Sequence, residues 1–410
     1  MKIHRANQQV IEKSFKKSFV TAILGPRRVG KTYFVTAYAR RHPEACWVLL
    51  NLDKITDRTT IEQGNLESLI IEQAKYHIGE GEKIWVAIDE AQKCPEVFNQ
   101  IKVLYDEYKD TDHIKFILTG SAVLSLHQLS AETLAGRIEL YHLYEFTLRE
   151  TVAIEHDLEL NTSVFDCIMH DHDLETLSEL IHQARPFKPI LENELINHLC
   201  WGGFPETFSM QESEDKIIYL QNYLQTYLEK DVRAIESISN LNLYKNMMDH
   251  AAETTGSIRN DQRIIESLGC TRDTLKKYRG LLEATLLYQD VYPYINSTLK
   301  RLVKNPKTYL LSNGLISVLT GLTDLNVLQR SGLIGHRLEN WFLNELKTYC
   351  VRSPMQPDIN FWRTMTGVEV DFILIKKPTV YPFEVTFSIK KESKKIKNLM
   401  NFMQDEKKAP

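Results

Sequence analysis

The chain has 410 residues, 25% charged and 43% hydrophobic, which excludes a largely disordered protein and is enough for two or three domains. Fifty Lys and Arg against 54 Asp and Glu give a net charge of −4, so any binding to nucleic acid must come from a local patch. No apolar run reaches about 18 residues and none opens the chain, so we expect no transmembrane helix, no secretory signal, no membrane partner and a cytoplasmic location. Six scattered cysteines predict free thiols.

The first motif follows an apolar run at 19–24, which predicts a buried strand, and precedes a predicted helix at 32–40. It fits GxxxxGK[ST] and comprises Gly25, Pro26, Arg27, Arg28, Val29, Gly30, Lys31 and Thr32. In such a loop backbone N–H groups surround phosphate oxygens, Lys31 reaches the β- and γ-phosphates, and Thr32 ligates Mg²⁺. The motif therefore predicts binding of ATP with Mg²⁺; a glycine-rich turn without a ligand is the alternative.

Two more strands are predicted at 46–51 and 84–88, and the second closes on Asp89 and Glu90. An apolar strand that ends in Asp-Glu is the Walker B pattern. We expect Asp89 to hold Mg²⁺ through water and Glu90 to polarise the attacking water. The alternative is an acidic residue that only caps the next helix.

A fourth predicted strand, 115–118, ends in Thr119-Gly120-Ser121. The polar end of this strand predicts a γ-phosphate sensor, with Thr119 as first choice and Ser121 as second. Arg137 precedes a fifth apolar strand near 138–143 and is a candidate arginine finger, acting on its own or on a neighbour's nucleotide. An ordinary surface salt bridge is the alternative for Arg137.

These segments together resemble a known family. GPRRVGKT, IWVAIDEAQ, ILTGSAVLSL and LAGRIELYHLYEFTLRE look like an AAA+ superfamily ATPase, and more narrowly like a group of prokaryotic ATPases with a C-terminal region of unknown function. The resemblance continues through GGFPE at 202–206 and YLEKDV at 227–232, where Lys230 replaces the usual arginine. It covers most of the chain except about 151–190.

The middle of the chain predicts a spacer and a helical region. Acids and histidines gather within 151–190, where they could bind a metal, but a solvated helix end or loop is the favoured interpretation; they are Asp166, His170, Asp171, His172 and Asp173. Helical patterns follow at 191–199, 217–238 and 241–254.

Residues 257–292 predict a winged helix-turn-helix. A short helix at 260–268 leads through a turn, with Thr271 as N-cap, into a second helix at 275–282 and a strand at 286–292. This second helix region carries four basic residues that would reach a DNA groove or phosphates: Arg272, Lys276, Lys277 and Arg279. A winged helix used only for packing or protein contact is an equal alternative.

The last 80 residues predict the order helix, three strands, helix, which begins a restriction-endonuclease-like fold. Asp371 and Glu384 are expected on adjacent strands and Glu339 on the preceding helix, three carboxylates for a second metal site. In nucleases of this kind the second acid belongs to a Glu-x-Lys pattern. Here the pattern beginning at Glu384 has Thr386 in place of the lysine, so we expect a degenerate site without robust cleavage. Lys390 would substitute only if the chain returned it to the site, and a lysine-rich run follows it. The expected last strand is missing, so the ending is either unusual or truncated.

We therefore expect an α/β protein: a P-loop AAA+ core with a parallel sheet at 1–150, a spacer and helical region at 151–256, a winged helix at 257–300, and a restriction-endonuclease-like domain at 301–410. The expected function is an ATPase that acts on or near DNA. The alternatives are a nucleotide-switched scaffold for a partner protein and an ATP-regulated metal-dependent nuclease. A homo-oligomer is also compatible with the pattern.

Overall fold

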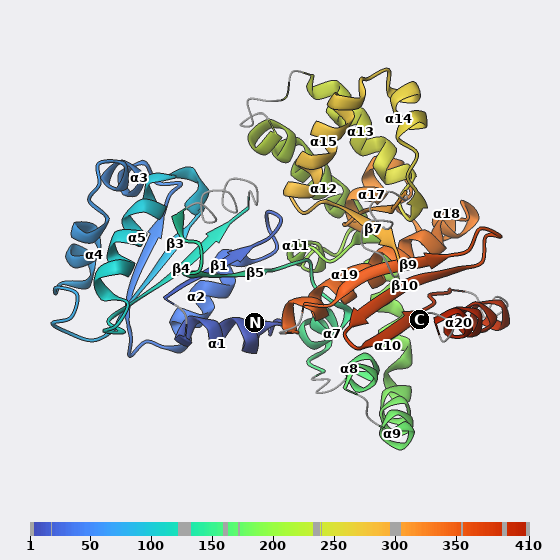
Figure 1. Ribbon diagram of the computed structural model, residues 1–410, viewed down its shortest axis with the longest axis horizontal. Helices are drawn as coiled ribbons and strands as arrows, with labels where there is room; N and C mark the ends of the chain where they lie inside the picture. The colour runs from blue at the N-terminus through green and yellow to red at the C-terminus, as the bar shows by residue number, and fades with distance from the viewer. Residues whose placement is uncertain are drawn as a thin grey trace. The chain divides into compact units, whose positions relative to one another are not determined.

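The computed structural model describes residues 4–17, 19–121, 133–158, 163–170, 173–232, 238, 240–295, 305–353, 356–387 and 392–406 (Figure 1). The described chain forms two compact units. The first unit comprises residues 7–144 and 276–288, and the second comprises residues 1–6, 145–275 and 289–410.

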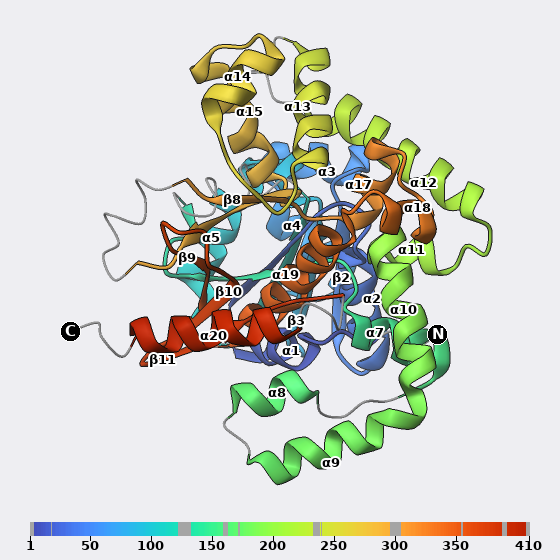
Figure 2. The ribbon, with the colours of Figure 1, turned by 90° about the vertical axis from the view of Figure 1, so that its right-hand side faces the viewer.

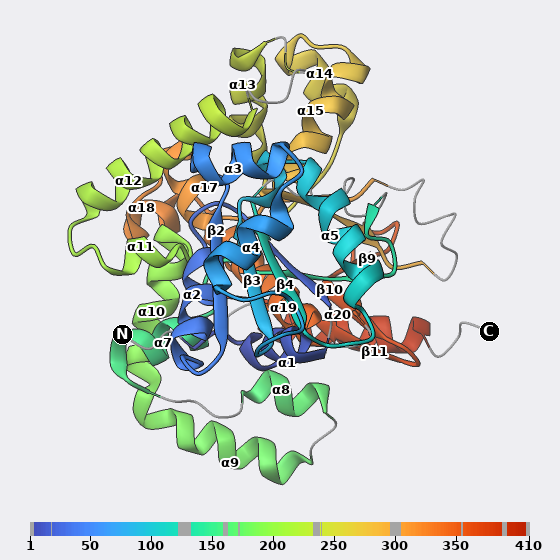
Figure 3. The ribbon, with the colours of Figure 1, turned by 90° about the vertical axis from the view of Figure 1, so that its left-hand side faces the viewer.

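The first unit alternates strands and helices around one parallel sheet (Figure 3). Its elements are α1 (Gln8–Lys17), β1 (Val20–Leu24), α2 (Lys31–Arg41), β2 (Cys46–Asn51), α3 (Ile55–Glu62), α4 (Leu66–Ala74), β3 (Ile84–Asp89), the 3₁₀ turn η1 (Ala91–Lys93), α5 (Glu96–Tyr108), β4 (Ile114–Gly120) and β5 (Ile138–His142). The sheet order is β2-β3-β4-β1-β5, and each neighbouring pair is parallel. The predicted α/β fold with a parallel sheet is confirmed.

Strand alternation explains how the sheet is covered on both faces. Val20, Val86 and Phe116 belong to one core cluster together with apolar residues of α3, α4 and α5. Trp85 is offset by one residue from Val86 and therefore points to the other face. There its ring lies 6.0 Å from that of Tyr38 on α2. Because both faces are buried, these strands are continuous apolar runs, the pattern typical of parallel sheets.

The second unit combines helices with a six-stranded sheet (Figure 2). Its helices are α7 (Leu148–His156), α8 (Val164–Met169), α9 (Leu174–Ala184), η2 (Arg185–Phe187), α10 (Lys188–Trp201), α11 (Pro205–Phe208), α12 (Ser213–Thr226), the π-helical η3 (Tyr227–Val232), α13 (Leu241–Glu253), α14 (Asp261–Leu268), α17 (Asn313–Thr320), α18 (Leu325–Arg330), α19 (Ile334–Arg352) and α20 (Glu392–Glu406). Helix α15 (Arg272–Ala284) begins in this unit and continues into residues assigned to the first.

The sheet of the second unit has the order β11-β10-β9-β7-β8-β6. Its strands are β6 (Ser257–Ile258), β7 (Tyr288–Pro293), β8 (Lys307–Leu310), β9 (Asp358–Arg363), β10 (Glu369–Lys376) and β11 (Thr379–Phe383). Strand β7 pairs in parallel with β9 through Tyr292 and Asn360, so the segments expected to form two domains share one sheet. The boundary expected after residue 300 falls between two hydrogen-bonded strands of that sheet.

The GGFPE segment at 202–206 owes its glycines to close backbone packing. The N–H of Gly203 donates to Glu145 Oε2 at 2.7 Å, and its carbonyl accepts from Phe146 N at 2.8 Å. A Cβ on Gly203 would lie 2.5 Å from Phe146 O. Gly202 has a φ of 71°, a conformation that glycine adopts without strain. This family-like motif therefore serves local packing next to α7.

The described part of the chain contains no helix that is both long and apolar enough to cross a membrane.

Candidate functional site

The P-loop lies at the edge of the first sheet where the parallel strands end. It joins the last residue of β1, Leu24, to α2, which begins at Lys31. A Cβ on Gly25 would lie 2.1 Å from Leu143 O, so only glycine allows the loop to approach the chain after β5. Arg28 and Gly30 have φ values of 61° and 93°, which curve the loop back toward the helix N-terminus. Backbone N–H groups and the helix dipole thus favour an anion here.

Lys31, Thr32, Asp89 and Thr119 meet at this edge. Lys31 is 6% exposed, and its Nζ donates to the carbonyls of Gly25 at 2.9 Å and Pro26 at 2.7 Å. Thr32 Oγ1 donates to Asp89 Oδ2 at 3.0 Å, and Thr119 Oγ1 donates to Asp89 Oδ1. The sheet order explains the convergence, because β4 lies between β1 and β3 and brings Thr119 beside both motifs.

Glu90 is held beside Asp89 in an unusual backbone conformation. Its φ is 56°, which is uncommon for a residue other than glycine and is frequent at functional sites. Glu90 Oε2 accepts from Gln92 Nε2 at 2.5 Å and from Ser121 Oγ at 3.2 Å. Gln92, on η1, was not among the predicted site residues. The only feature of the sequence that could have indicated Gln92 is its position two residues after Glu90, in the AIDEAQ segment.

Arg137 lies away from its own chain's P-loop. It precedes Ile138, which pairs with Val20 at the start of β1, whereas the P-loop follows Leu24 at the opposite end. Four residues of strand separate the two ends, or roughly 13 Å at about 3.3 Å per residue. The Arg137 Nη2 instead donates to Asp106 at 3.3 Å, and the guanidinium lies 5.1 Å from the Tyr105 ring centre. The salt bridge named as the alternative is present, and any finger role would be on a neighbouring chain.

The basic residues of α15 differ in exposure. Arg272, Lys276 and Lys277 are exposed. Arg279 is only partly exposed, and its Nε lies 4.0 Å from Glu283 one turn later. Thr271 caps the helix as predicted, because its Oγ1 accepts from the N–H of Thr274 at 3.2 Å.

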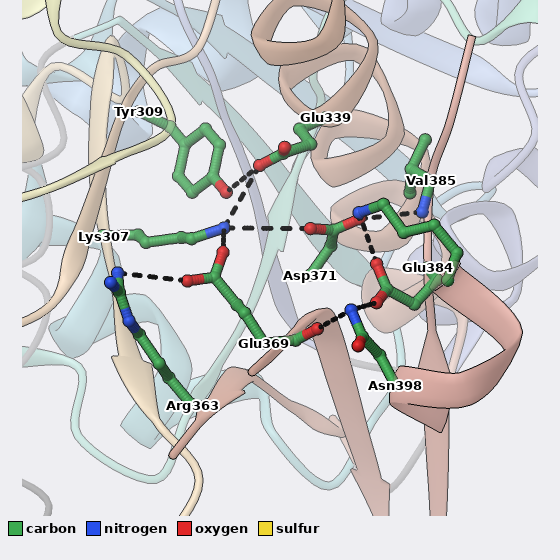
Figure 4. A network of polar contacts seen from close by, with 10 residues as sticks. Lys307, Tyr309, Glu339, Arg363, Glu369, Asp371, Glu384, Val385 and Asn398 are labelled. Carbon is green, nitrogen blue, oxygen red and sulfur yellow. Dashed lines mark hydrogen bonds and ion pairs between the residues drawn. The ribbon is translucent and has the colours of Figure 1, made fainter. Parts of the chain in front are cut away.

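The carboxylates predicted for a second metal site converge in the second unit, but lysines lie between them (Figure 4). Lys307, on β8 and 3% exposed, contacts Glu369 at 2.5 Å, Glu339 at 3.3 Å and Asp371 at 4.0 Å. On α20, Lys395 Nζ donates to Asp371 Oδ2 at 2.6 Å and to Glu384 Oε2 at 2.5 Å.

Backbone register explains why Asp371 and Glu384 are neighbours. Phe372 on β10 pairs with Phe383 on β11, and the two acids flank that pair. Glu384 was expected within the strand, but β11 ends at Phe383, so the acid lies just beyond it. This lets Asn398 on α20 donate to Glu384 Oε1 at 2.9 Å.

Charges in this cluster are partly compensated. Burial would raise the pKa of Asp371, but hydrogen bonding with Glu384 and the two lysines outweighs it and lowers the pKa. Burial and the neighbouring Asp371 raise the pKa of Glu384 to about 8, so the acid pair tends to share one proton. Among the residues that the structure describes, no group of three or more His, Cys, Asp and Glu side chains is arranged to hold a metal ion. A divalent ion would have to displace an ammonium group here.

Two expectations concern residues outside the described ranges. Lys390, named as a possible substitute lysine, lies outside them, whereas the described Lys395 contacts both Asp371 and Glu384. Asp171 and His172 of the acid-histidine group also lie outside them. Asp166 of that group accepts ion pairs from Arg352 at 2.7 Å and Arg149 at 3.3 Å.

Comparisons with known proteins divide the chain into three matched segments. Residues 17–152 match the family model of an AAA domain. Residues 192–326 and 334–410 match two models described as domains of unknown function, DUF8612 and DUF4143.

The relatives that match most of this chain have low sequence identity to it. An uncharacterised protein of Mycobacterium tuberculosis is 23% identical over 377 residues, which cover 92% of this chain and 72% of that protein. An uncharacterised protein of Haemophilus influenzae is 23% identical over 416 residues, covering 98% and 90%. Among solved structures, a Walker-type ATPase of Pyrococcus abyssi has a TM-score of 0.47 at 17% identity, covering 78% of this chain and 96% of that one. The ORC2 protein of Aeropyrum pernix in its ADP form has a TM-score of 0.37 at 14% identity, covering 81% and 95%.

The AAA-domain match coincides with the parallel sheet and with the convergence of Lys31, Thr32 and Asp89. The first unit therefore has the fold of an AAA+ ATPase core, and its edge site is that of an ATP-binding domain.

Proposed function

We propose that this chain binds ATP with Mg²⁺ at the P-loop, hydrolyses it slowly, and couples the nucleotide state to DNA bound through α14 and α15. The single observation that carries the proposal is the meeting of Lys31, Thr32 and Asp89 at one sheet edge with Glu90 beside them. On ATP binding, Lys31 Nζ exchanges the carbonyls of Gly25 and Pro26 for phosphate oxygens.

Each residue then has a defined task. The oxygens of Thr32 and Asp89 suit a hard cation, and Mg²⁺ held there would neutralise the β- and γ-phosphate charge. Thr119, which donates to Asp89, would contact the γ-phosphate. Glu90 accepts a proton from the attacking water, and Gln92 and Ser121 hold its carboxylate in place.

Support for the DNA-binding step comes from the helical pair and the sheet beside it. The order β6-α14-α15-β7-β8, with β8 between β7 and β6, suits a winged helix. Arg272, Lys276 and Lys277 are exposed on α15, where they are available to phosphates. These three cations form a local basic patch. A local patch is needed for DNA binding because the net charge of the chain is −4.

The test is the ATPase rate of the full chain with Mg²⁺, alone and with duplex DNA, single-stranded DNA or RNA. We expect slow hydrolysis that duplex DNA stimulates and that Glu90→Gln abolishes. Hydrolysis that DNA leaves unchanged would contradict the DNA step and favour a nucleotide-switched protein scaffold. Absence of ATP binding would contradict the whole proposal.

Arg137 provides a test of assembly. If it acts on a neighbouring chain's nucleotide, Arg137→Ala and Lys31→Ala variants should each be inactive alone but regain part of the activity when mixed. Full activity of Arg137→Ala alone would leave Arg137 as the partner of Asp106 only.

A further inference from the structure

A cavity of about 680 Å³ lies wholly within the second unit. Its walls come from α7, α8, α9, α10 and α19, elements that Figure 2 shows together. The volume falls in the range of small-molecule pockets, roughly 300–1,000 Å³. No step of the proposed ATPase mechanism uses this cavity.

One face of α19 supplies much of the wall. The lining positions follow helical spacing, so they form a continuous stripe along the helix: Trp341, Phe342, Glu345, Thr348, Tyr349 and Arg352. The stripe carries aromatic rings, two hydrogen-bonding groups and a cation. A helix face used only for packing would be more uniformly apolar.

Part of the cavity lining is aromatic. The Phe165 ring of α8 packs edge-on against Tyr349, with ring centres 4.9 Å apart. Phe342 stands at 86° to Phe165, with centres 6.5 Å apart. Leu180 and Leu191 complete this wall. Such a lining favours an aliphatic or aromatic body.

Two hydrogen-bonding side chains of α19 also line the cavity. Thr348 is 4% exposed, and its Oγ1 has no hydrogen-bond partner among the described residues, which is rare for a buried hydroxyl. Glu345, one turn earlier, accepts the N–H of Leu148 at 2.8 Å on Oε1. Burial raises the pKa of Glu345 to about 8, which favours the protonated carboxyl group at neutral pH. Both groups suit a neutral oxygen on a ligand.

A more exposed charged group lines the same cavity. Arg149 and Arg352 share one carboxylate, that of Asp166, so the trio has a net charge of +1. The nearby Glu150 does not cancel it, because Arg5 pairs with Glu150 at 2.9 Å. Burial also lowers the pKa of Arg149, because desolvation disfavours its charged form.

We propose that this cavity binds a small hydroxy- or oxo-carboxylic acid with an apolar body. The carboxylate meets Arg149 and Arg352, the body lies among the aromatic rings, and the neutral oxygen bonds Thr348 and Glu345. The site is distinct from the P-loop, and the inference does not depend on ATP hydrolysis.

Three matched probes test the two ends separately: 10-hydroxydecanoate, decanoate and 1,10-decanediol, titrated by calorimetry and by Trp341 fluorescence. We expect 10-hydroxydecanoate to bind the full chain with a Kd on the order of 0.1 mM, an affinity ordinary for a ligand of its size. Decanoate should bind about fivefold more weakly, the effect of one hydrogen bond. The diol should bind at least about tenfold more weakly for want of a charge-assisted contact.

Variants assign these differences to residues. Thr348→Val should remove the advantage of the hydroxy acid over decanoate. Arg149→Gln should weaken both acids but not the diol, whereas the exposed Arg330→Gln serves as the charge-matched control and should change nothing. Ala184→Phe fills the cavity and should abolish all binding while circular dichroism stays unchanged.

The proposal is overturned if the parent binds none of the probes at about 1 mM, roughly ten times the expected Kd. It is also overturned if a folded Ala184→Phe binds them like the parent, or if the diol binds as tightly as the acids. If Ala184→Phe does not fold, the test rests on Thr348→Val and Arg149→Gln. The proposal is then overturned if these variants keep the parent's preferences among the three probes.

Discussion

At the scale of single residues, we expect the P-loop lysine and the Walker B glutamate to perform separable tasks. Lys31 Nζ donates to two loop carbonyls, and we expect its transfer to phosphate oxygens to contribute to ATP binding. Glu90 accepts hydrogen bonds from Gln92 and Ser121, so we expect it to act on the attacking water rather than on nucleotide binding.

We therefore predict that Lys31→Ala loses nucleotide binding, whereas Glu90→Gln keeps it and loses turnover by roughly 10²–10⁴. Fluorescent-ATP titration and phosphate release measure the two effects. Lys102→Ala, a change at an exposed lysine on α5, is the control and should retain both. ATP hydrolysis by Lys31→Ala at the parental rate would contradict the role given to this loop.

Glu345 makes the stability of the second unit depend on pH. Burial raises its folded pKa to about 8 from an unfolded value of 4.5, so the folded state holds a proton that the unfolded state has lost between these values. The stabilising contribution is complete below pH 4.5 and is lost as pH rises toward 8, by at most about 1.4 kcal/mol per pH unit.

Glu345→Gln cannot ionise and should be less sensitive to alkali than the parent. Urea unfolding at pH 5 and pH 8 measures the difference. We expect the parent to lose more unfolding free energy than the variant between the two. Equal losses would show that Glu345 ionises freely in the folded state.

At the scale of elements, α15 carries the DNA hypothesis. Its exposed cations are Arg272, Lys276 and Lys277, and Arg279 is the less accessible fourth. Changing the three exposed residues to Ala should weaken duplex binding and reduce its salt slope by about 0.9 per lost phosphate contact. Fluorescence anisotropy from 50 to 200 mM salt measures both, a range over which phosphate contacts dominate.

The control for this triple variant changes Lys13, Lys16 and Lys17 on α1, which removes the same charge from another helix. If both triple variants lose affinity equally, the effect belongs to overall charge and α15 is not the binding element. No binding by the parent at about 50 mM salt with ATP present removes the DNA hypothesis.

Helix α20 supplies a lysine to the acid pair, yet we still predict no robust DNA cleavage. Lys395 and Lys307 compensate the carboxylates, and a metal ion must compete with them. Linear duplex DNA with Mg²⁺ or Mn²⁺ should stay intact, with or without ATP. Clear cleavage that Asp371→Ala abolishes would contradict this prediction.

Two variants refine the cleavage test. Lys395→Ala removes the cation that contacts both Asp371 and Glu384 and leaves, among the described cations, only Lys307, 4.0 Å from Asp371, which should destabilise the second unit by about 3–5 kcal/mol. Thr386→Lys restores the Glu-x-Lys spacing and is the variant in which metal-dependent cleavage would first appear. If Lys395→Ala unfolds like the parent in urea, the ion pairs contribute nothing to holding α20.

At the scale of the whole molecule, the two compact units should respond differently to nucleotide. We expect ATP with Mg²⁺ to bind the first unit, and a ligand at 100 times its Kd stabilises the folded form by about 2.7 kcal/mol. Hydrogen exchange should therefore slow at 24–34, 88–93 and 119–121, and Lys31→Ala should abolish the effect. Equal slowing of hydrogen exchange around Asp371 and Glu384, at β10 and β11, would indicate a second nucleotide site.

The sequence determined the ATPase core almost completely. Both the GxxxxGKT loop and the Asp-Glu pair are local patterns, each attached to a continuous apolar strand, so neighbouring residues along the chain decide them. The resemblance predicted the parallel sheet of the core, but the order of its five strands came only from the structure. Exposure of Arg272, Lys276 and Lys277 likewise follows from helical spacing.

Only the tertiary structure decided which distant groups meet. Lys307 and Lys395 reach the carboxylates from β8 and α20, and no local pattern relates residues so far apart. The hydrogen bond between Gln92 and Glu90 depends on the turn of η1. The separation of Arg137 from the P-loop depends on the direction of the strands. The cavity along α19 depends on which helices cover that stripe. Long-range packing, rather than local propensity, fixes these arrangements, which is why a single sequence does not reveal them.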